Sequence, residues 1–588
     1  MLERVSVART IAWFTFAAMP LGLMPGIFLS HDVMPKVIFL LIGAAFLLFL
    51  LPQWWGGIEK LQSTQRGRWF VWLVVAQAVL LALSTLFSEQ PLLSFAGTTW
   101  RRFGMVEQIA GLVVACAIAA LAAAKPESTS ALWRLCVVCG GIASIYGISQ
   151  YFGFDPLLDR RLYSIDYLGG ITRPPATMGH AIYYSAYLVP IALIAAWQAG
   201  AEKSRQWRTI HAAVAALAPL AILLSGSRGA LLGLAGAWIF LIAHMRPSRK
   251  LISVATAASL AAIALVAFSP AGATLRHRVA QWREDPGSAR LGVWRESPEL
   301  ISKAPLLGSG PETFATAFRA VESAELSRAY PDFYQETPHN AFIDAACSEG
   351  LPGTLILVGI FALALSGKGP YGLRAAIVGT LICSLFASFS IVTATYLWAA
   401  AGILSAEAPK KAATAKTARL KAKKTDAPSA LVPIGILGGV AFLAVAVMLG
   451  VQDAAYAELG RAVNAKDLSG ARRALKRATS FGIGMPGYEL WSSQELSKLS
   501  AWNDARDAAA LAALRGEDRF SAVYQASLLE IVNGDASGAE SKASEAIGLA
   551  PNWYKPHLLR AQILEAMGRN REAAQEAQQS LKLGWKGK

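Results

Sequence analysis

The chain has few charged residues for its length. Only 16% of its 588 residues are charged and 54% are hydrophobic, with a mean hydropathy of +0.41. Soluble domains carry about 25% charged residues, so this composition excludes an ordinary soluble enzyme or binding domain. The charge is also unbalanced, because 55 Lys and Arg against 39 Asp and Glu give a net charge of +16.

Cysteine is scarce, and no Asp-x-Asp pair occurs anywhere in the sequence. The five cysteines all lie in apolar segments, which indicates no disulfide framework. Cys136 and Cys139 form a Cys-x-x-Cys, but the same hydrophobic segment holds no second pair and no His. A metal site needs those further ligands. We therefore interpret both as small packing residues and predict no metal site.

Long apolar runs, in contrast, are abundant. A helix needs about 20 apolar residues to cross about 30 Å of hydrocarbon, and thirteen runs approach that length: 11–30, 33–52, 69–87, 106–124, 131–151, 180–199, 209–225, 228–245, 251–269, 351–367, 375–391, 392–407 and 430–450. The first is too long for a cleaved signal peptide. The sequence predicts an all-α, polytopic membrane protein with 12 or 13 transmembrane helices.

Lys and Arg are concentrated in alternate connections. With a cytoplasmic N-terminus, the inside segments are 56–68, 201–208, 246–250, 366–374 and 409–424, all basic and nearly free of acid. This is the pattern of the positive-inside rule. Much of the positive net charge is then explained by these cytoplasmic segments, and it gives no support for a nucleic-acid partner. We interpret 409–429, with its Lys-rich stretch, as a cytoplasmic linker facing the membrane rather than a nucleic-acid-binding segment.

The segments left on the outer face are 88–104, 152–179, 270–350 and the chain after 451. They contain arginines that the charge rule disfavours there: Arg101, Arg102, Arg160, Arg161, Arg173, Arg290 and Arg295. Any one of them fits a surface residue or a partner of a carboxylate. As a set they indicate that an anion is handled on the outer face, because Arg forms bidentate contacts with phosphate oxygens.

The segment 452–588 has an internal period. Alanine recurs at a step of 34 at Ala471, Ala505, Ala539 and Ala573, and four residues further along Leu475, Ala509, Ala543 and Ala577 keep the same step. Such a period is typical of tetratricopeptide repeats, whose two helices cross at small residues. The sequence therefore predicts an α-solenoid of these repeats. It says of their function only that they bind a partner or a glycan.

One polar cluster lies in "LLSGSRGALLG" (Leu223–Gly233). It places Arg228 between two apolar helices at the predicted outer surface. Such an Arg can simply snorkel to the interface. Gly226 and Gly229 enclose it, however, and permit close approach of the backbone. We therefore interpret Arg228 as a ligand anchor.

A second cluster lies in "TPHNAFIDAACSEGLPG" (Thr337–Gly353). Thr337 and Pro338 predict the N-cap and first residue of a short helix, with His339 in its first turn. The helix dipole keeps imidazole neutral there, which makes His339 a candidate general base. The alternative is a His that caps the helix and bonds a loop carbonyl. Glu349 precedes a Gly-Leu-Pro-Gly that redirects the chain into the next span.

Together these motifs resemble a family. "SGSRGALLG", "ARLGVW" followed by "PLLGSGPETF", and "HNAFIDAACSEGLPG" occur in the order and spacing typical of the O-antigen ligase and O-antigen polymerase superfamily. The segments 88–108 and 173–190 resemble its earlier outer loops, and the resemblance covers about residues 10–405. One departure is "GHAIYY", where the family has an Asn-Pro-Asn-like turn. His180 is the candidate to replace contacts of that turn.

The resemblance implies a GT-C-like fold that transfers glycans from undecaprenyl diphosphate carriers on the periplasmic face, without metal or cofactor. By motif matching, Arg228 and Arg290 would hold the diphosphate and His339 would deprotonate the acceptor hydroxyl for an inverting attack. Glu349 would orient the helix or the acceptor. Further substrate contacts are expected from six residues: Arg101, Arg102, Arg173, His180, Asn340 and Arg295.

Several functions fit this resemblance. The first is an O-antigen ligase that moves a finished glycan onto lipid A-core or a similar acceptor. The others are a polymerase of lipid-linked repeat units, a protein O-oligosaccharyltransferase, and a non-catalytic protein that binds or transports a lipid diphosphate. The expected partners are the lipid-linked donor, a lipid or glycan acceptor, membrane lipids and a protein bound through the repeats.

The expected organisation is a glycan-transfer domain at 1–408 with a long periplasmic loop at about 270–350. It continues with the linker at 409–429, a final span at 430–450 and a periplasmic repeat domain at 452–588. The expected location is the bacterial inner membrane, with the N-terminus in the cytoplasm.

Overall fold

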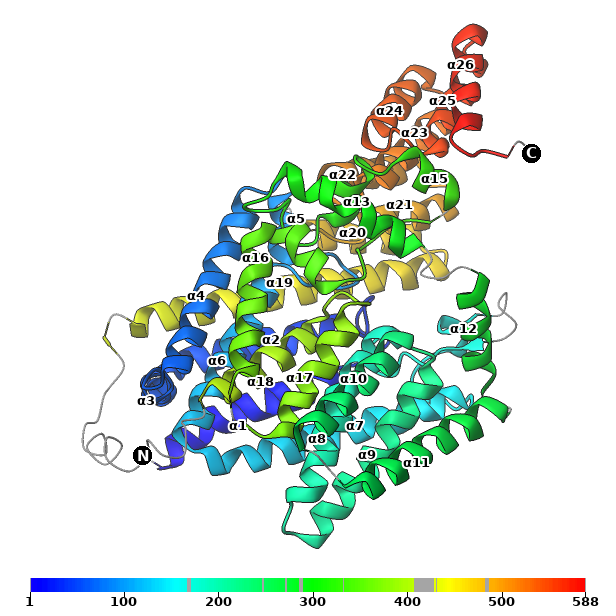
Figure 1. Ribbon diagram of the computed structural model, residues 1–588. Helices are drawn as coiled ribbons and strands as arrows, with labels where there is room; N and C mark the ends of the chain where they lie inside the picture. Colours follow the sequence, from blue (N-terminus) through cyan, green and yellow to red (C-terminus); the bar gives the residue numbers. More distant parts are fainter. Residues whose placement is uncertain are drawn as a thin grey trace.

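The computed structural model describes residues 2–165, 171–245, 248–269, 272–284, 289–331, 333–367, 369–406, 428–429, 431–481 and 486–586. The predicted linker at 409–429 lies almost wholly outside these residues. The regular secondary structure of the described part is helical except for one two-stranded antiparallel ladder, β1 (Ser164–Ile165) with β2 (Ile171–Thr172). The all-α class is therefore confirmed (Figure 1).

The amino-terminal half of the helical region contains α1 (Leu2–Ala18), η1 (Met19–Leu21), α2 (Met34–Phe49), α3 (Leu51–Gln62), α4 (Gln65–Leu86), α5 (Pro91–Ala96), α6 (Met105–Ala124), η2 (Pro126–Ser128), α7 (Thr129–Tyr151), η3 (Arg160–Leu162), α8 (Ala181–Ala201), α9 (Arg205–Ser225) and α10 (Arg228–Met245). The next helices along the chain are α11 (Arg249–Phe268), α12 (Ala273–Glu284), α13 (Ala289–Lys303), α14 (Phe314–Arg319), α15 (Ala324–Ala329), α16 (Ala341–Leu365), α17 (Tyr371–Ser384), α18 (Ile391–Ala406) and α19 (Leu431–Asn464).

Among the described residues, 8 helices are long and apolar enough to cross a membrane, or 9 if the bent pair of α2 and α3 is one span, so this is a multi-pass membrane protein with fewer candidate spans than the 12 or 13 predicted. They are α4, η2 with α7, α6, α8, α9, α10, α16 and α19. The predicted span at 33–52 is bent instead, because α2 and α3 meet at 84°. Pro52 lies at the start of α3 and has no N–H to continue the helical ladder of α2.

The predicted boundary at 391/392 is wrong. α17 ends at Ser384 and α18 begins at Ile391, with a short connection between them. α17 has 14 residues. At about 1.5 Å per residue it is shorter than the hydrocarbon core. The apolar pattern could not show this break, because the connection itself contains Leu385, Phe386, Ala387 and Phe389.

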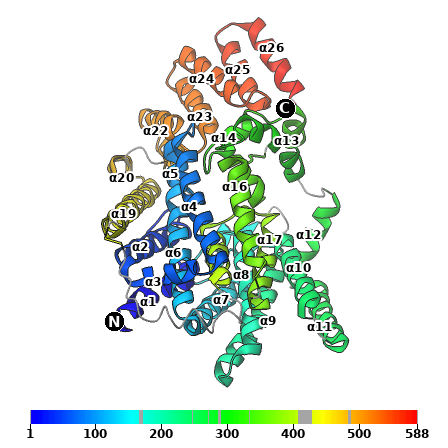
Figure 2. The same cartoon turned by 60° about the vertical axis from the view of Figure 1, so that its left-hand side comes forward.

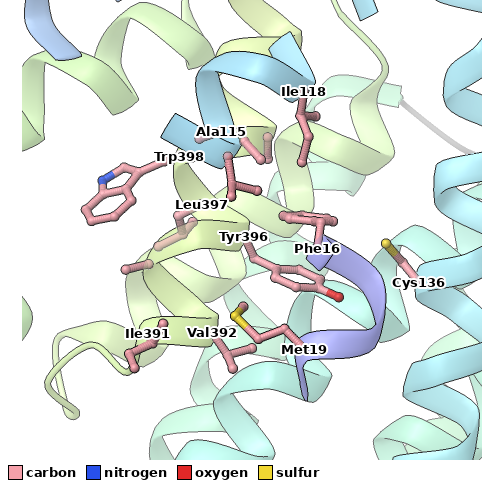
Figure 3. Packing of buried hydrophobic residues seen from close by; sticks show 14 of the residues in the cluster. Phe16, Met19, Ala115, Ile118, Cys136, Ile391, Val392, Tyr396, Leu397 and Trp398 are labelled. Atoms are coloured by element: carbon pink, nitrogen blue, oxygen red, sulfur yellow. The ribbon is translucent and has the colours of Figure 1, made fainter. Parts of the chain in front are cut away.

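α18 is the central helix of the membrane domain, since all its described residues from Ile391 to Ser405 are buried. Its Tyr396 stacks on Phe16 of α1, with ring centroids 4.1 Å apart (Figure 3). α6 packs closely on it because a Cβ at Gly111 would lie 2.8 Å from Thr395 Oγ1. Without a hydrophobic force between helices in lipid, such close packing of small residues holds the bundle together.

The carboxy-terminal region continues from α19 without a break at the predicted boundary of 450–452. It contains α20 (Leu468–Phe481), α21 (Glu489–Lys498), α22 (Trp502–Arg515), α23 (Arg519–Val532), α24 (Ala536–Leu549), α25 (Tyr554–Ala566) and α26 (Asn570–Lys582). The periodic Ala471, Ala505 and Ala539 are fully buried, and Gly534 turns the chain with φ 79°. Assignment to the tetratricopeptide class stays a prediction.

Of the segments predicted to be outside, those that form α5 and α13 lie beside the carboxy-terminal helices in both views, whereas α12 lies away from these helices in Figure 2 (Figures 1 and 2). Two hydrogen bonds join distant parts of these segments, Thr99 Oγ1 to Glu517 Oε1 at 2.8 Å and Asn552 Nδ2 to Glu322 O at 2.8 Å. A third joins the end of the first predicted span to the carboxy-terminal region, Ser30 Oγ to Asp453 Oδ2 at 2.5 Å. Two of the segments predicted to be inside contact the ends of predicted spans. Arg134 pairs with Glu202 at 2.9 Å, and Lys60 Nζ donates to Ala124 O at 3.2 Å.

Candidate functional site

The polar segment before α16 folds differently from the sequence prediction. Asn340 is the N-cap, and its Oδ1 accepts from the backbone N–H of Phe342 at 3.0 Å and Ile343 at 3.2 Å. Asn is a stronger N-cap than Thr, which explains why Thr337 does not take this role. His339 therefore precedes the helix, with a positive φ of 50°. Both its predicted place in the first turn and the capping alternative are wrong.

His339 is held in place from two sides. Trp294 Nε1 donates to the carbonyl of Pro338 at 2.7 Å, and Thr337 Oγ1 accepts from the backbone N–H of His339 at 3.3 Å. The Thr337 hydroxyl also lies 3.4 Å from His339 Nδ1. These contacts leave Nε2 as the ring nitrogen to face a substrate.

The imidazole of His339 is neutral near pH 7. Burial, and to a lesser extent the charges of Arg290, His180 and Arg101, lower the pKa of His339 from 6.5 to about 3. The neutral form expected from the sequence is thus present, although burial rather than the helix dipole is the main cause. A neutral imidazole can accept a proton from a hydroxyl group.

His339 lines a cavity of about 390 Å³ at the end of the helical bundle. Its walls come from the start of α2, the 100–101 segment, the start of α8 and the connection between α17 and α18. His180 and Tyr183 face it from α8, where His180 is the N-cap and its Nδ1 accepts from Ile182 N at 3.1 Å. This volume falls in the usual range for ligand sites.

Three arginines gather in a small cleft beside this cavity. Arg173, Arg228 and Arg290 line it together with Ser227 and Phe386. None of the described residues that line it is acidic. Ile182 and Ala387 border both the cleft and the His339 cavity, so the two spaces adjoin.

The local sequence explains how two of these arginines reach the cleft. Gly226 ends α9 with φ 66°, and Arg228 is the first residue of α10. A Cβ at Gly229 would lie 3.1 Å from Phe386 Cβ, so the small residue permits this approach. Arg290 is the second residue of α13 and its Nη1 donates to Phe386 O at 3.3 Å.

This placement has an electrostatic consequence. Helix N-termini carry partial positive charge, and a cation in the first turn is disfavoured by about 0.3–1 kcal/mol. Arg228 and Arg290 both lie in first turns, beside a third cation, Arg173. A bound anion would offset this repulsion between positive charges, because helix N-termini and Arg side chains both attract phosphate oxygens.

The other predicted arginines lie apart from this cleft. Arg101 lines the His339 cavity, but it pairs with Glu312 and with Asp344, the latter at 2.8 Å. Arg102 is fully buried and donates to Ala96 O at 3.3 Å and Pro486 O at 3.4 Å, which ties the 88–104 segment to the carboxy-terminal region. Arg295 is exposed on α13 and lines neither space.

Glu349 is not in the His339 cavity. It accepts from Gln77 Nε2 of α4 at 2.5 Å and lines a separate small cavity with Arg101 and Asp344. The next residue, Gly350, has φ 73° and ψ −176° and breaks the helical path inside α16. The chain is therefore redirected at Gly350, two residues before the Pro-Gly that was predicted to redirect it. The position of Glu349 suits orientation of α16 rather than contact with substrate.

Sequence reasoning missed several wall residues. Lys36 lines the cavity and ties three segments together, donating to Gly22 O at 2.8 Å, to Thr177 O at 2.5 Å and to Asp32 O. The sequence did contain a signal for Lys36, because this ionisable residue lies inside the apolar run 33–52 and such residues are functional-site candidates. Glu312 and Asp344, the partners of Arg101, had no comparable local signal.

No cluster of three or more His, Cys, Asp or Glu side chains in the described part of the chain could hold a metal ion. The five cysteines are free.

Comparison with known proteins gives one result that bears on the site. No curated protein matches the chain. A family model described as O-antigen ligase matches residues 212–358, which include Arg228, Arg290, His339 and Glu349 but not Arg173 or His180. The match supports the O-antigen ligase superfamily and, with the candidate spans, an O-antigen ligase- or polymerase-type multi-pass membrane protein.

Proposed function

We propose that the protein is a glycosyltransferase of the O-antigen ligase type. It moves a glycan from undecaprenyl diphosphate to an acceptor hydroxyl on lipid A-core or a similar molecule, with inversion at the anomeric carbon. The observation that carries this proposal is the arginine cleft, with its two helix N-termini, adjoining a cavity that holds a neutral His339.

The arginine cleft would hold the diphosphate. Its volume is about 20 Å³, room for about one water molecule, which needs roughly 10–15 Å³, and too little for a diphosphate. The phosphate oxygens would therefore lie at its mouth, toward the His339 cavity, where Arg228 and Arg290 stabilise the charge that develops on the leaving group. The anomeric carbon would then lie between the cleft and His339.

Transfer would follow from this arrangement. His339 Nε2 takes the proton of the acceptor hydroxyl while its oxygen attacks the anomeric carbon. The bond from that carbon to the diphosphate oxygen breaks, and its electron pair leaves with the undecaprenyl diphosphate. The new glycosidic bond forms on the opposite face of the sugar, which gives inversion.

The direct test is incubation of the purified chain with a lipid-linked glycan and candidate acceptors. A ligase gives a single transferred product, a polymerase gives a ladder, and a protein oligosaccharyltransferase labels a polypeptide. Absence of any transfer, together with binding of the donor, would indicate a binding or transport protein instead.

We expect transfer to survive EDTA. The cations placed to neutralise the diphosphate are arginine side chains, so chelation should change the initial rate by less than about twofold, whereas a Lewis-acid metal supplies several kcal/mol of stabilisation. The measurement is the rate before and after chelation and dialysis. Loss of activity that added Mg²⁺ or Mn²⁺ restores would contradict the arginine mechanism.

The proposed location is the bacterial inner membrane, with the repeat domain and the site in the periplasm. Support comes from the basic segments at the predicted cytoplasmic end and from the contacts that Ser30, Thr99 and Glu322 make with the chain after 451. Ser537 is exposed on α24, and the native cysteines are buried or half-buried. In Ser537→Cys, a membrane-impermeant thiol reagent should label the cysteine in cells with a permeabilised outer membrane. Labelling only after lysis would reverse the topology.

A further inference from the structure

A second cavity lies between the outer segments of the membrane domain and the carboxy-terminal helices. It measures about 230 Å³, several times the share of one water molecule, about 30 Å³. Its polar and aromatic walls come from three parts of the chain: Thr98 and Trp100, Tyr334 and Glu336, and Tyr488, Trp491, Gln494, Glu517 and Asp518. It is therefore large enough for a small organic group.

Direct contacts fix the two sides of this cavity. The Glu517 carboxylate accepts from the backbone N–H of Thr99 at 2.5 Å and from its hydroxyl at 2.8 Å. The Tyr488 hydroxyl donates to Thr99 O at 3.4 Å. Farther out, the guanidinium of Arg319 lies 4.2 Å from the ring centre of Trp553. The carboxy-terminal helices are thus seated on the outer segments, and the cavity is part of that junction.

The chemistry of the walls favours a neutral saccharide. Four partly exposed aromatic rings, those of Trp100, Tyr334, Tyr488 and Trp491, offer apolar faces on which sugar rings pack. Glu336 and Gln494 are exposed and offer acceptors and donors for hydroxyl groups. The charged residues among the described lining are acidic, so a phosphate group would be repelled.

This cavity continues into the one that holds His339. Trp100, Glu336 and Tyr488 border both. The charge of the walls changes along the path, from the arginine cleft, through the neutral His339, to the carboxylates at the junction. A substrate with an anionic end and a hydroxyl-rich end matches this order.

We propose that the junction cavity is a binding subsite for neutral sugar residues, to which the carboxy-terminal region contributes Tyr488, Trp491 and Gln494. The sugars belong to one of the two glycans that meet at His339. This proposal rests on the function proposed above. It assigns the carboxy-terminal helices a direct part in binding the glycan.

The test uses the purified full-length chain and three probes. Two are neutral oligosaccharides, one released from the lipid carrier and one from the delipidated acceptor, and the third is inorganic diphosphate. Binding is measured by saturation-transfer NMR and calorimetry. The variants are Trp491→Ala, which removes a stacking surface, Gln494→Ala, whose exposed side chain can be lost without repacking, and Arg290→Lys. The matched control is Gln575→Ala, an exposed glutamine on α26 outside the cavity.

We expect one of the oligosaccharides to bind wild type and to bind Trp491→Ala and Gln494→Ala about tenfold more weakly, as truncation of interface anchors does. Gln575→Ala and Arg290→Lys should leave this affinity unchanged. Which oligosaccharide binds identifies the glycan as donor or acceptor. Wild-type binding of neither, or equal binding by wild type and both cavity variants, overturns the subsite. Diphosphate binding that is insensitive to Arg290→Lys counts against the proposed function instead and leaves the saccharide result standing.

Discussion

Replacing Arg228 or Arg290 by Lys should lower the rate of glycan transfer by roughly 10²–10³. Lys keeps the positive charge, but a single ammonium cannot reproduce the two parallel contacts of a guanidinium with a diphosphate. Loss of one such contact to a developing anion costs about 3–4 kcal/mol. Because both side chains lie at helix N-termini on one cleft, each change should also weaken binding of the donor.

The matched control is Arg295→Lys. Arg295 lies on the same helix as Arg290 but is exposed and outside the cleft, so this change should leave the rate within about twofold of wild type. The measurement is the initial rate of transfer and the donor affinity of each purified variant. Full activity in both Arg228→Lys and Arg290→Lys would mean that the cleft does not hold the leaving group.

Much of this cleft could be predicted because its signals are local. Arg228 stands out between two apolar runs with Gly226 and Gly229 around it, and Arg290 stands out as a cation on the disfavoured face of the membrane. A residue that breaks a one-dimensional rule can be recognised from its neighbours in the chain. The sequence could not show that Arg228 and Arg290 meet in one cleft, because their helices, α10 and α13, are separated in the chain by α11 and α12.

Arg101 shows where local reasoning fails. It breaks the same charge rule, but its partners Glu312 and Asp344 follow 211 and 243 residues later in the chain. No period or composition reports an ion pair over such a distance. The sequence therefore predicted a substrate contact for Arg101, which does line the His339 cavity, but not its pairing with two carboxylates.

The boundaries of the helices also divide into those that local sequence predicts and those that depend on distant contacts. Long apolar helices were predictable from hydropathy, but the connection between α17 and α18 was not, since it is itself apolar. This connection contributes Ala387, Ser388 and Ser390 to the wall of the His339 cavity. Packing against neighbouring helices decides where such a helix ends, and a single sequence contains little information about these contacts.

Replacing His339 by Asn should lower the turnover number by roughly 10²–10⁴, because proton transfer in the transition state is lost. Asn is the suitable replacement here, since it tolerates the positive φ of this position better than Ala does. Donor binding should stay close to wild type because the arginine cleft is unchanged. The matched control is His180→Asn, which keeps an N-cap on α8 and removes the other imidazole of the cavity.

The pH profile distinguishes a general base from a structural histidine. Burial and the neighbouring cations lower the pKa of His339 from 6.5 to about 3, so the base stays neutral and available down to about pH 4 in the free enzyme. On this account kcat/KM, which reports the free enzyme, should stay level from pH 8 to pH 5. A bound diphosphate adds negative charge beside Arg290 and raises this pKa, so the acid limb of kcat should lie at higher pH than that of kcat/KM. A kcat/KM that falls with a midpoint near 6.5, or a His339→Asn protein with wild-type turnover, would rule out His339 as the base.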